Sequence, residues 1–155
     1  MHLMSTDLVE LKDIRKKNLG DLVSLYEYNY ILINKLAPDI QSQQGGRVSR
    51  VSQQLDLYMS VLNTSKYTTT IKLTYFFREE YNIKHIPDIR IKIYHDARLA
   101  EVLLLDDSGV NYDVPFNEKI FCSLFVKKWK INSFLNKWLH YCLKQGHQFC
   151  IENKI

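Results

Sequence analysis

The fold is decided by residues 55–75, which read LDLYMSVLNTSKYTTTIKLTY. Side chains of apolar or β-prone residues occupy every second position from 55 to 61, and the alternation resumes from position 67 to 75. A period of two predicts strands that each bury one face. The polar residues 63–66 between the two runs favour a turn, so the stretch predicts a β-hairpin.

A second hairpin is predicted further along the chain. Isoleucine at positions 89, 91 and 93 alternates with Arg90, Lys92 and Tyr94, and residues 100–105 form another β-prone run. A tight turn around Ala97 and Arg98 would join the two strands. The intervening segment 76–87 is long enough for a helical turn or for a crossover, and the sequence does not choose between them.

Helices are predicted on both sides of these hairpins. Near the start, Asp7 with Glu10 predicts a short first helix, and Asp21 predicts the cap of a second helix that ends before Pro38. Residues 39–46 and 106–117 lack periodicity and are expected to be a mobile connection and a surface loop. The clearest helical spacing, ended by Gly146, is that of Ile131, Phe134, Leu135, Trp138, Leu139, Cys142 and Leu143.

These elements predict one α+β domain over residues 1–155. An antiparallel sheet of about four strands, made of two β-hairpins, would be packed by N-terminal helices and a C-terminal amphipathic helix. The chain has 155 residues, of which 46% are hydrophobic, which suits a single core. We therefore expect one globular domain.

The composition also indicates where in the cell the protein is expected. The net charge is only +4, and the chain shows neither a secretory signal at its start nor a run of roughly 18 apolar residues. Cys122, Cys142 and Cys150 are odd in number and lack C-x-x-C spacing, so neither a disulfide framework nor a zinc knuckle is indicated. We expect a cytoplasmic protein with free thiols, no cofactor and no membrane insertion.

Four blocks of sequence stand out, namely residues 26–30 (Tyr-Glu-Tyr-Asn-Tyr), 65–69 (Ser-Lys-Tyr-Thr-Thr), 94–97 (Tyr-His-Asp-Ala) and the final helix from Ile131-Asn132 to Gly146. In this order they resemble the YqiB-like family of uncharacterised gammaproteobacterial proteins. The resemblance covers most of the chain and implies a bacterial cytoplasmic domain of unknown function. Residues 126–128 (Val-Lys-Lys) replace an acidic run typical of the family, so no role of that run is carried over.

The second hairpin contains a possible ligand or functional cluster formed by Lys92, Tyr94, His95, Asp96 and Glu101. With a tight turn at Ala97 and Arg98, Tyr94 would lie opposite Glu101. Asp96 would share their face, and His95 would point to the isoleucine side. The cluster is either a polar or acid/base pair or an ordinary turn with a cross-strand charge ladder. The spacing of the histidines predicts no metal site.

The final helix also carries a possible polyanion contact. Lys130, Lys137 and Lys144 recur every seven residues and form a basic stripe. Such a stripe is able to follow a phosphate backbone, although it is also the ordinary solvated face of an amphipathic helix. Tyr28 and Tyr30 either form a partner surface or cover a flank of the sheet.

Known catalytic motifs are missing from the sequence, which contains no G-x-S-x-G, Walker A or G-x-G-x-x-G string. We therefore expect a non-enzymatic binding or adaptor module that acts through an unknown protein partner or its own dimer. RNA or polyanion binding by the C-terminal helix is one alternative. A small-ligand or hydrolytic site at the Tyr94 to Glu101 hairpin is the other.

Overall fold

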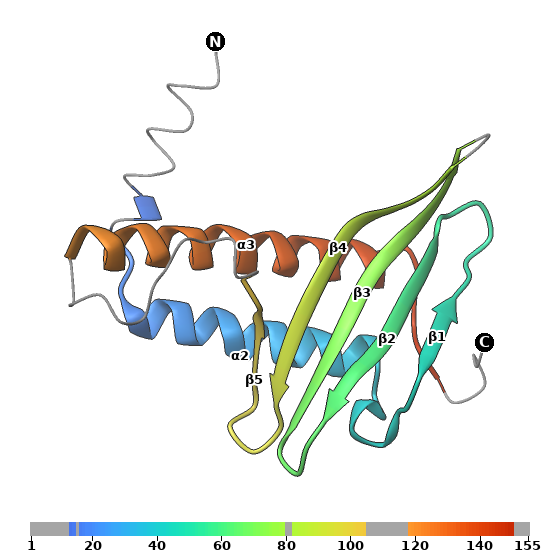
Figure 1. Cartoon of the computed structure of the whole chain (residues 1–155), viewed down its shortest axis with the longest axis horizontal. Helices are drawn as coiled ribbons and strands as arrows, with labels where there is room; N and C mark the ends of the chain where they lie inside the picture. Colours follow the sequence, from blue (N-terminus) through green and yellow to red (C-terminus); the bar gives the residue numbers. More distant parts are fainter. Residues whose placement is uncertain (1–12, 15, 80–81, 105–117, 151–155) are drawn as a thin grey trace.

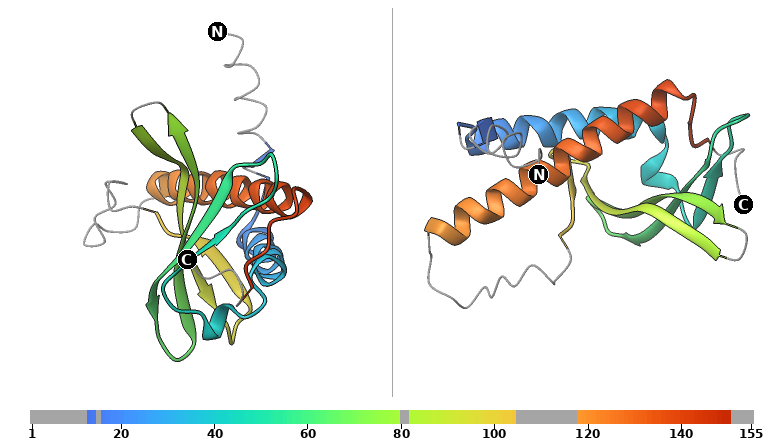
Figure 2. Two further views of the ribbon diagram at one scale, coloured as in Figure 1. Left: turned by 90° about the vertical axis from the view of Figure 1, so that its right-hand side faces the viewer. Right: turned by 90° about the horizontal axis from the view of Figure 1, so that it is seen from above.

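The computed structural model describes residues 13–14, 16–79, 82–104 and 118–150. Its elements are helix α2 (Leu19–Leu36), the 3₁₀ turn η1 (Ile40–Ser42), strands β1 (Gly46–Ser49), β2 (Asp56–Thr64), β3 (Thr68–Glu79), β4 (Asn82–Tyr94) and β5 (Leu99–Val102), and helix α3 (Glu118–Lys144). The strands form an antiparallel sheet in the order β1-β2-β3-β4-β5, and α2 and α3 lie side by side against one face of it (Figures 1 and 2). The predicted α+β class is confirmed.

The sheet of the described residues has five strands, where the sequence predicted about four. The additional strand is β1, whose residues Arg47, Val48 and Ser49 are all buried and therefore show no alternation. The segment before it was expected to be an irregular connection, yet it contains η1 and the buried Ile40. The C-terminal segment covers β1, because Arg47 Nη1 donates to the carbonyl of Cys150 at 2.9 Å.

Among the described residues between the two hairpins there is neither a helical turn nor a crossover. Instead, β3 and β4 remain paired as far as Glu79 and Asn82. A register shift between Thr74 and Phe76 interrupts this ladder. Because a bulge breaks the period of two, the sequence pattern did not reveal that the strands continue beyond it.

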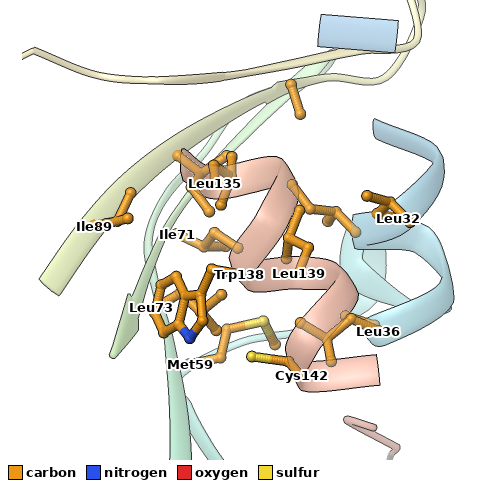
Figure 3. Packing of buried hydrophobic residues seen from close by; sticks show 14 of the residues in the cluster. Leu32, Leu36, Met59, Ile71, Leu73, Ile89, Leu135, Trp138, Leu139 and Cys142 are labelled. Atoms are coloured by element: carbon orange, nitrogen blue, oxygen red, sulfur yellow. The ribbon is translucent and has the colours of Figure 1, made fainter. Parts of the chain in front are cut away.

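The core lies between the sheet and the two helices (Figure 3). Its sheet side includes Met59, Ile71, Leu73 and Ile89, and its helix side includes Leu135 and Leu139 of α3 with Leu32 and Leu36 of α2. Burying one such side chain contributes roughly 1.5–3 kcal/mol. Phe134, which the helical pattern assigned to the apolar stripe, is instead 44% exposed.

The helix boundaries differ from the predicted ones for identifiable reasons. Asn18, and not Asp21, caps the N-terminus of α2. Asp21 completes the capping box, because its carboxylate accepts a hydrogen bond from the backbone amide of Asn18 at 2.8 Å. Helix α3 begins at Glu118, well before the regular pattern that starts at Ile131. The predicted cap at Asp7 and Glu10 and the loop at 106–117 lie outside the described residues.

Three asparagines join α2, α3 and the edge strand β5. Asn29 Nδ2 donates to the Asn132 carbonyl at 3.1 Å, and Asn136 Nδ2 donates to Asn29 Oδ1 at 3.0 Å. Asn132 Oδ1 accepts from the buried Val102 amide at 2.9 Å. This explains the single polar residue, Asn29, on the apolar stripe of α2, because a buried amide requires partners.

None of the described helices is both long enough and apolar enough to span a bilayer.

Candidate functional site

The β4–β5 hairpin places its polar residues differently from the prediction. The turn comprises residues 95–98, so Tyr94 pairs with Leu99 and Lys92 pairs with Glu101. The predicted pairing of Tyr94 with Glu101 is therefore wrong, because it assumed a turn of two residues. Lys92, Tyr94 and Glu101 nevertheless share the face away from the isoleucines, since they occupy alternate positions on neighbouring strands.

Because β5 is the edge strand of the sheet, the carboxylate of Glu101 lies beside two phenols, one on β4 and one on α2. The Tyr94 hydroxyl donates to Glu101 Oε1 at 2.8 Å, and Lys92 Nζ lies 5.3 Å from the centre of the Tyr94 ring. Burial, reinforced by this hydrogen bond, raises the pKa of Tyr94 to about 12. Tyr94 is thus protonated at neutral pH and acts as a hydrogen-bond donor.

The second phenol, Tyr26 of α2, was not among the predicted site residues. Its hydroxyl is shielded from solvent and makes no hydrogen bond of standard geometry, yet it lies close enough to interact with Glu101. Burial first, and then the Glu101 carboxylate, raise the pKa of Tyr26 above its ordinary value. Only the packing of α2 against β5 reveals this neighbour, because Tyr26 and Glu101 are far apart in the sequence.

His95 and Asp96 do not join this cluster. His95 Nε2 lies 2.7 Å from Thr69 Oγ1 on the isoleucine side, where the alternation placed it. Burial lowers the pKa of His95, although Asp96 opposes the shift. The Asp96 residue itself is exposed in the turn. Within the described ranges, no group of three or more His, Cys, Asp or Glu side chains is arranged to hold a metal ion.

Helix α3 presents a surface that we call the basic face, formed by Lys127, Lys130, Phe134, Lys137, Tyr141 and Lys144. Its four lysines are exposed, and the two aromatic residues between them are 44% and 49% exposed. The alternating steps of three and four residues place all six side chains on one side of the helix. The sequence predicted the lysine stripe, but Phe134 was missed because its spacing also fits the core.

Positive charge is concentrated on this helix. Residues 122–144 contain five lysines and no Asp or Glu, whereas the whole chain has a net charge of only +4. The ion pairs of the described residues are Arg47–Asp39, Arg50–Asp56 and Lys72–Asp88, so no described carboxylate neutralises the basic face. A helix face with unpaired lysines attracts anions.

The two tyrosines predicted as a partner surface separate. Tyr28 is exposed, and its ring centroid lies 5.4 Å from that of His140 of α3, beside the basic face. Tyr30 is half-buried and packs against the core. Of these two tyrosines, Tyr28 alone is exposed enough to form part of a partner surface.

Comparisons with known proteins agree with the resemblance to the YqiB-like family that the sequence showed. The chain is 27% identical over 129 residues to the "Uncharacterized protein YqiB" of Escherichia coli K12, covering 81% of this chain and 89% of that protein. The YqiB proteins of E. coli O6:H1 and O157:H7 match with the same identity and coverage. No solved structure matches significantly. The family model described as "Protein of unknown function (DUF1249)" matches residues 32–148, more than half of the protein, and the chain therefore belongs to that family.

Proposed function

We propose that this protein is a non-enzymatic binding module that binds single-stranded nucleic acid along the basic face of α3. The observation that carries the proposal is the alternation of exposed lysines and exposed aromatic rings along one side of a helix without acidic residues. The cytoplasmic location and the single domain expected from the sequence remain part of the proposal.

The dimensions of the basic face suit an extended strand. From Lys127 to Lys144 the helix rises about 26 Å, at 1.5 Å per residue. Lys130, Lys137 and Lys144 follow one another at intervals of about 10 Å. Phe134 and Tyr141 lie between them at the same interval. A strand laid along the helix would therefore meet cations and rings in turn.

The chemistry of the two residue types is complementary. Lysines neutralise phosphates and release counterions, which makes binding dependent on salt. Stacking of a base on an aromatic ring contributes about 1–3 kcal/mol and tolerates any base. Exposed aromatic rings between lysines are not needed for a merely solvated helix face, because charged and small polar residues serve there equally well. The rings favour a partner with flat, unpaired bases.

A triple substitution tests the proposal. Replacing Lys130, Lys137 and Lys144 by Gln preserves helix propensity and removes three phosphate contacts. We expect the dissociation constant for a labelled oligouridine of about ten nucleotides, followed by fluorescence anisotropy, to rise more than tenfold at low salt. The slope of log affinity against log salt should fall by about 2, at roughly 0.7 per lost contact.

The matched control replaces the exposed Lys16, Lys35 and Lys66 by Gln, which lowers the net charge equally. Equal weakening by the two triple variants would mean that only overall charge matters, and the proposal would fail. It would fail as well if wild-type protein does not bind the oligonucleotide. Equal affinity for polyglutamate of similar length would point to an acidic protein partner instead.

A further inference from the structure

A cavity of about 230 Å³ is lined by residues from the N-terminal halves of α2 and α3 and by Glu101 of β5. Figure 1 shows how β5 passes beside the two helices. Its walls are mainly apolar and include Leu22 of α2 with Leu124 and Phe125 of α3. Three polar side chains also line it, namely Tyr26, Glu101 and Lys128. A small apolar cavity with a few converging polar groups is the usual form of a ligand site.

The two charged groups of the cavity do not neutralise each other. Glu101 and Lys128 line the same space, but neither belongs to an ion pair of the described residues. The Glu101 carboxylate is oriented by the Tyr94 hydroxyl at 2.8 Å. The site therefore offers one oriented negative group and one positive group among mainly apolar lining residues.

We propose that this cavity binds a small zwitterion with an apolar side chain, of the α-amino acid class. The ligand's ammonium group contacts Glu101, its carboxylate contacts Lys128, and its side chain packs against Leu22, Leu124 and Phe125. A ligand with a single charge would meet a like charge in the same space, whereas a zwitterion meets a complement for each of its groups. The volume also fits, because it is smaller than the roughly 300–1,000 Å³ typical of sites for drug-sized molecules.

This site is separate from the basic face. Lys128 is half-buried, whereas Lys127 and Lys130 are exposed. The cavity opens between α2 and α3, so its ligand does not compete for the lysines of the basic face. Failure of one proposal therefore leaves the other standing.

The proposal is tested by calorimetric titration of the full chain with leucine, phenylalanine and three truncated compounds. Isoamylamine lacks the carboxylate, 4-methylvalerate lacks the ammonium group, and glycine lacks the apolar side chain. We expect saturable binding of leucine or phenylalanine and at least roughly tenfold weaker binding of each truncated compound, because each loses one class of contact.

Variants locate the site. We expect Glu101→Gln and Lys128→Gln each to weaken binding of the amino acid by at least roughly tenfold, since each removes a charged partner. Lys35→Gln, outside the cavity, is the control and should bind as the wild type does. Circular dichroism checks that each variant is folded, and Lys128→Gln alters a half-exposed helix position that tolerates glutamine.

Several outcomes would overturn the inference. One is that neither amino acid binds the wild-type protein. Another is that isoamylamine or 4-methylvalerate binds as tightly as leucine. The third is that both folded cavity variants retain wild-type affinity, which would place the ligand elsewhere.

Discussion

His147 shows how one buried residue links stability to pH. It is 2% exposed, and its Nδ1 lies 2.9 Å from Ser49 Oγ, which ties the C-terminal segment to β1. Burial lowers the pKa of His147 below the ordinary value of 6.5 more than Asp56 and Ser49 raise it. Its Nε2 is also buried without a hydrogen-bond partner. Protonation therefore disfavours the folded state.

The pKa direction sets the sign of a stability change. Below pH 6.5 the unfolded chain takes up a proton at His147 before the folded protein does, so stability falls as the pH falls. His95, whose pKa is also lowered by burial, acts in the same direction. We expect the free energy of unfolding in urea to be smaller at about pH 5.5 than at about pH 7.5.

The variant His147→Gln tests whether this residue is responsible. The free energy of unfolding of this variant should fall less steeply over the same pH range than that of the wild type. The reason is that His147, one of the two histidines whose pKa is lowered by burial, no longer titrates. A wild-type protein as stable at the lower pH, or a variant that retains the whole fall, would contradict the assignment.

At the scale of elements, the asparagines determine how α2, α3 and β5 meet. In the variant Asn132→Ala the buried amide of Val102 loses its acceptor. An unsatisfied buried donor costs roughly 1–3 kcal/mol, so we expect the free energy of unfolding in urea to fall by that amount. The alanine itself favours the helix, so a change in helix propensity does not account for the loss.

Asn34→Ala is the matched control for that substitution. Asn34 Nδ2 donates only to the carbonyl of Tyr30 within its own helix, at 3.0 Å in a half-buried position. We expect its loss to change stability by less than about 0.5 kcal/mol, because no donor on another element is left unsatisfied. Equal losses in the two variants would show that the bridge between the elements contributes nothing.

The elements also show what the sequence was able to predict. Alternation revealed β2 and the first half of β3, since their apolar side chains face one core. The alternation missed β1, whose residues are buried on both faces. It also missed the end of β3 and the beginning of β4, which pair beyond the bulge. In α3 the helical period fits Phe134 equally well at the edge of the core and on the surface, and the folded structure leaves it 44% exposed.

For the whole molecule, the sequence predicted the fold class and the order of the elements along the chain. It did not predict which distant residues come into contact. The sheet is a meander in which each strand pairs with the next, so local patterns were nearly sufficient. The meeting of Tyr26 with Glu101, and of Lys128 with the same cavity, depends on two helices packing beside β5. Such contacts between distant residues carry no local signature.

The same arrangement separates two surfaces of α3. One side of the helix packs against the sheet and α2, while the basic face remains outside. Within the part of the chain that the structure describes, this surface is exposed, so a large partner can contact it without disturbing the core. We propose single-stranded nucleic acid as that partner.

Amide and aromatic-ring NMR signals, recorded while an oligouridine of about ten nucleotides is added, locate the surface that binds it. We expect the signals of the two aromatic rings to move upfield as bases stack on them, and the shifts to be concentrated at Lys127, Lys130, Phe134, Lys137, Tyr141 and Lys144. Shifts that concentrate on the open face of the sheet instead, or a spectrum that does not change, would contradict the proposal.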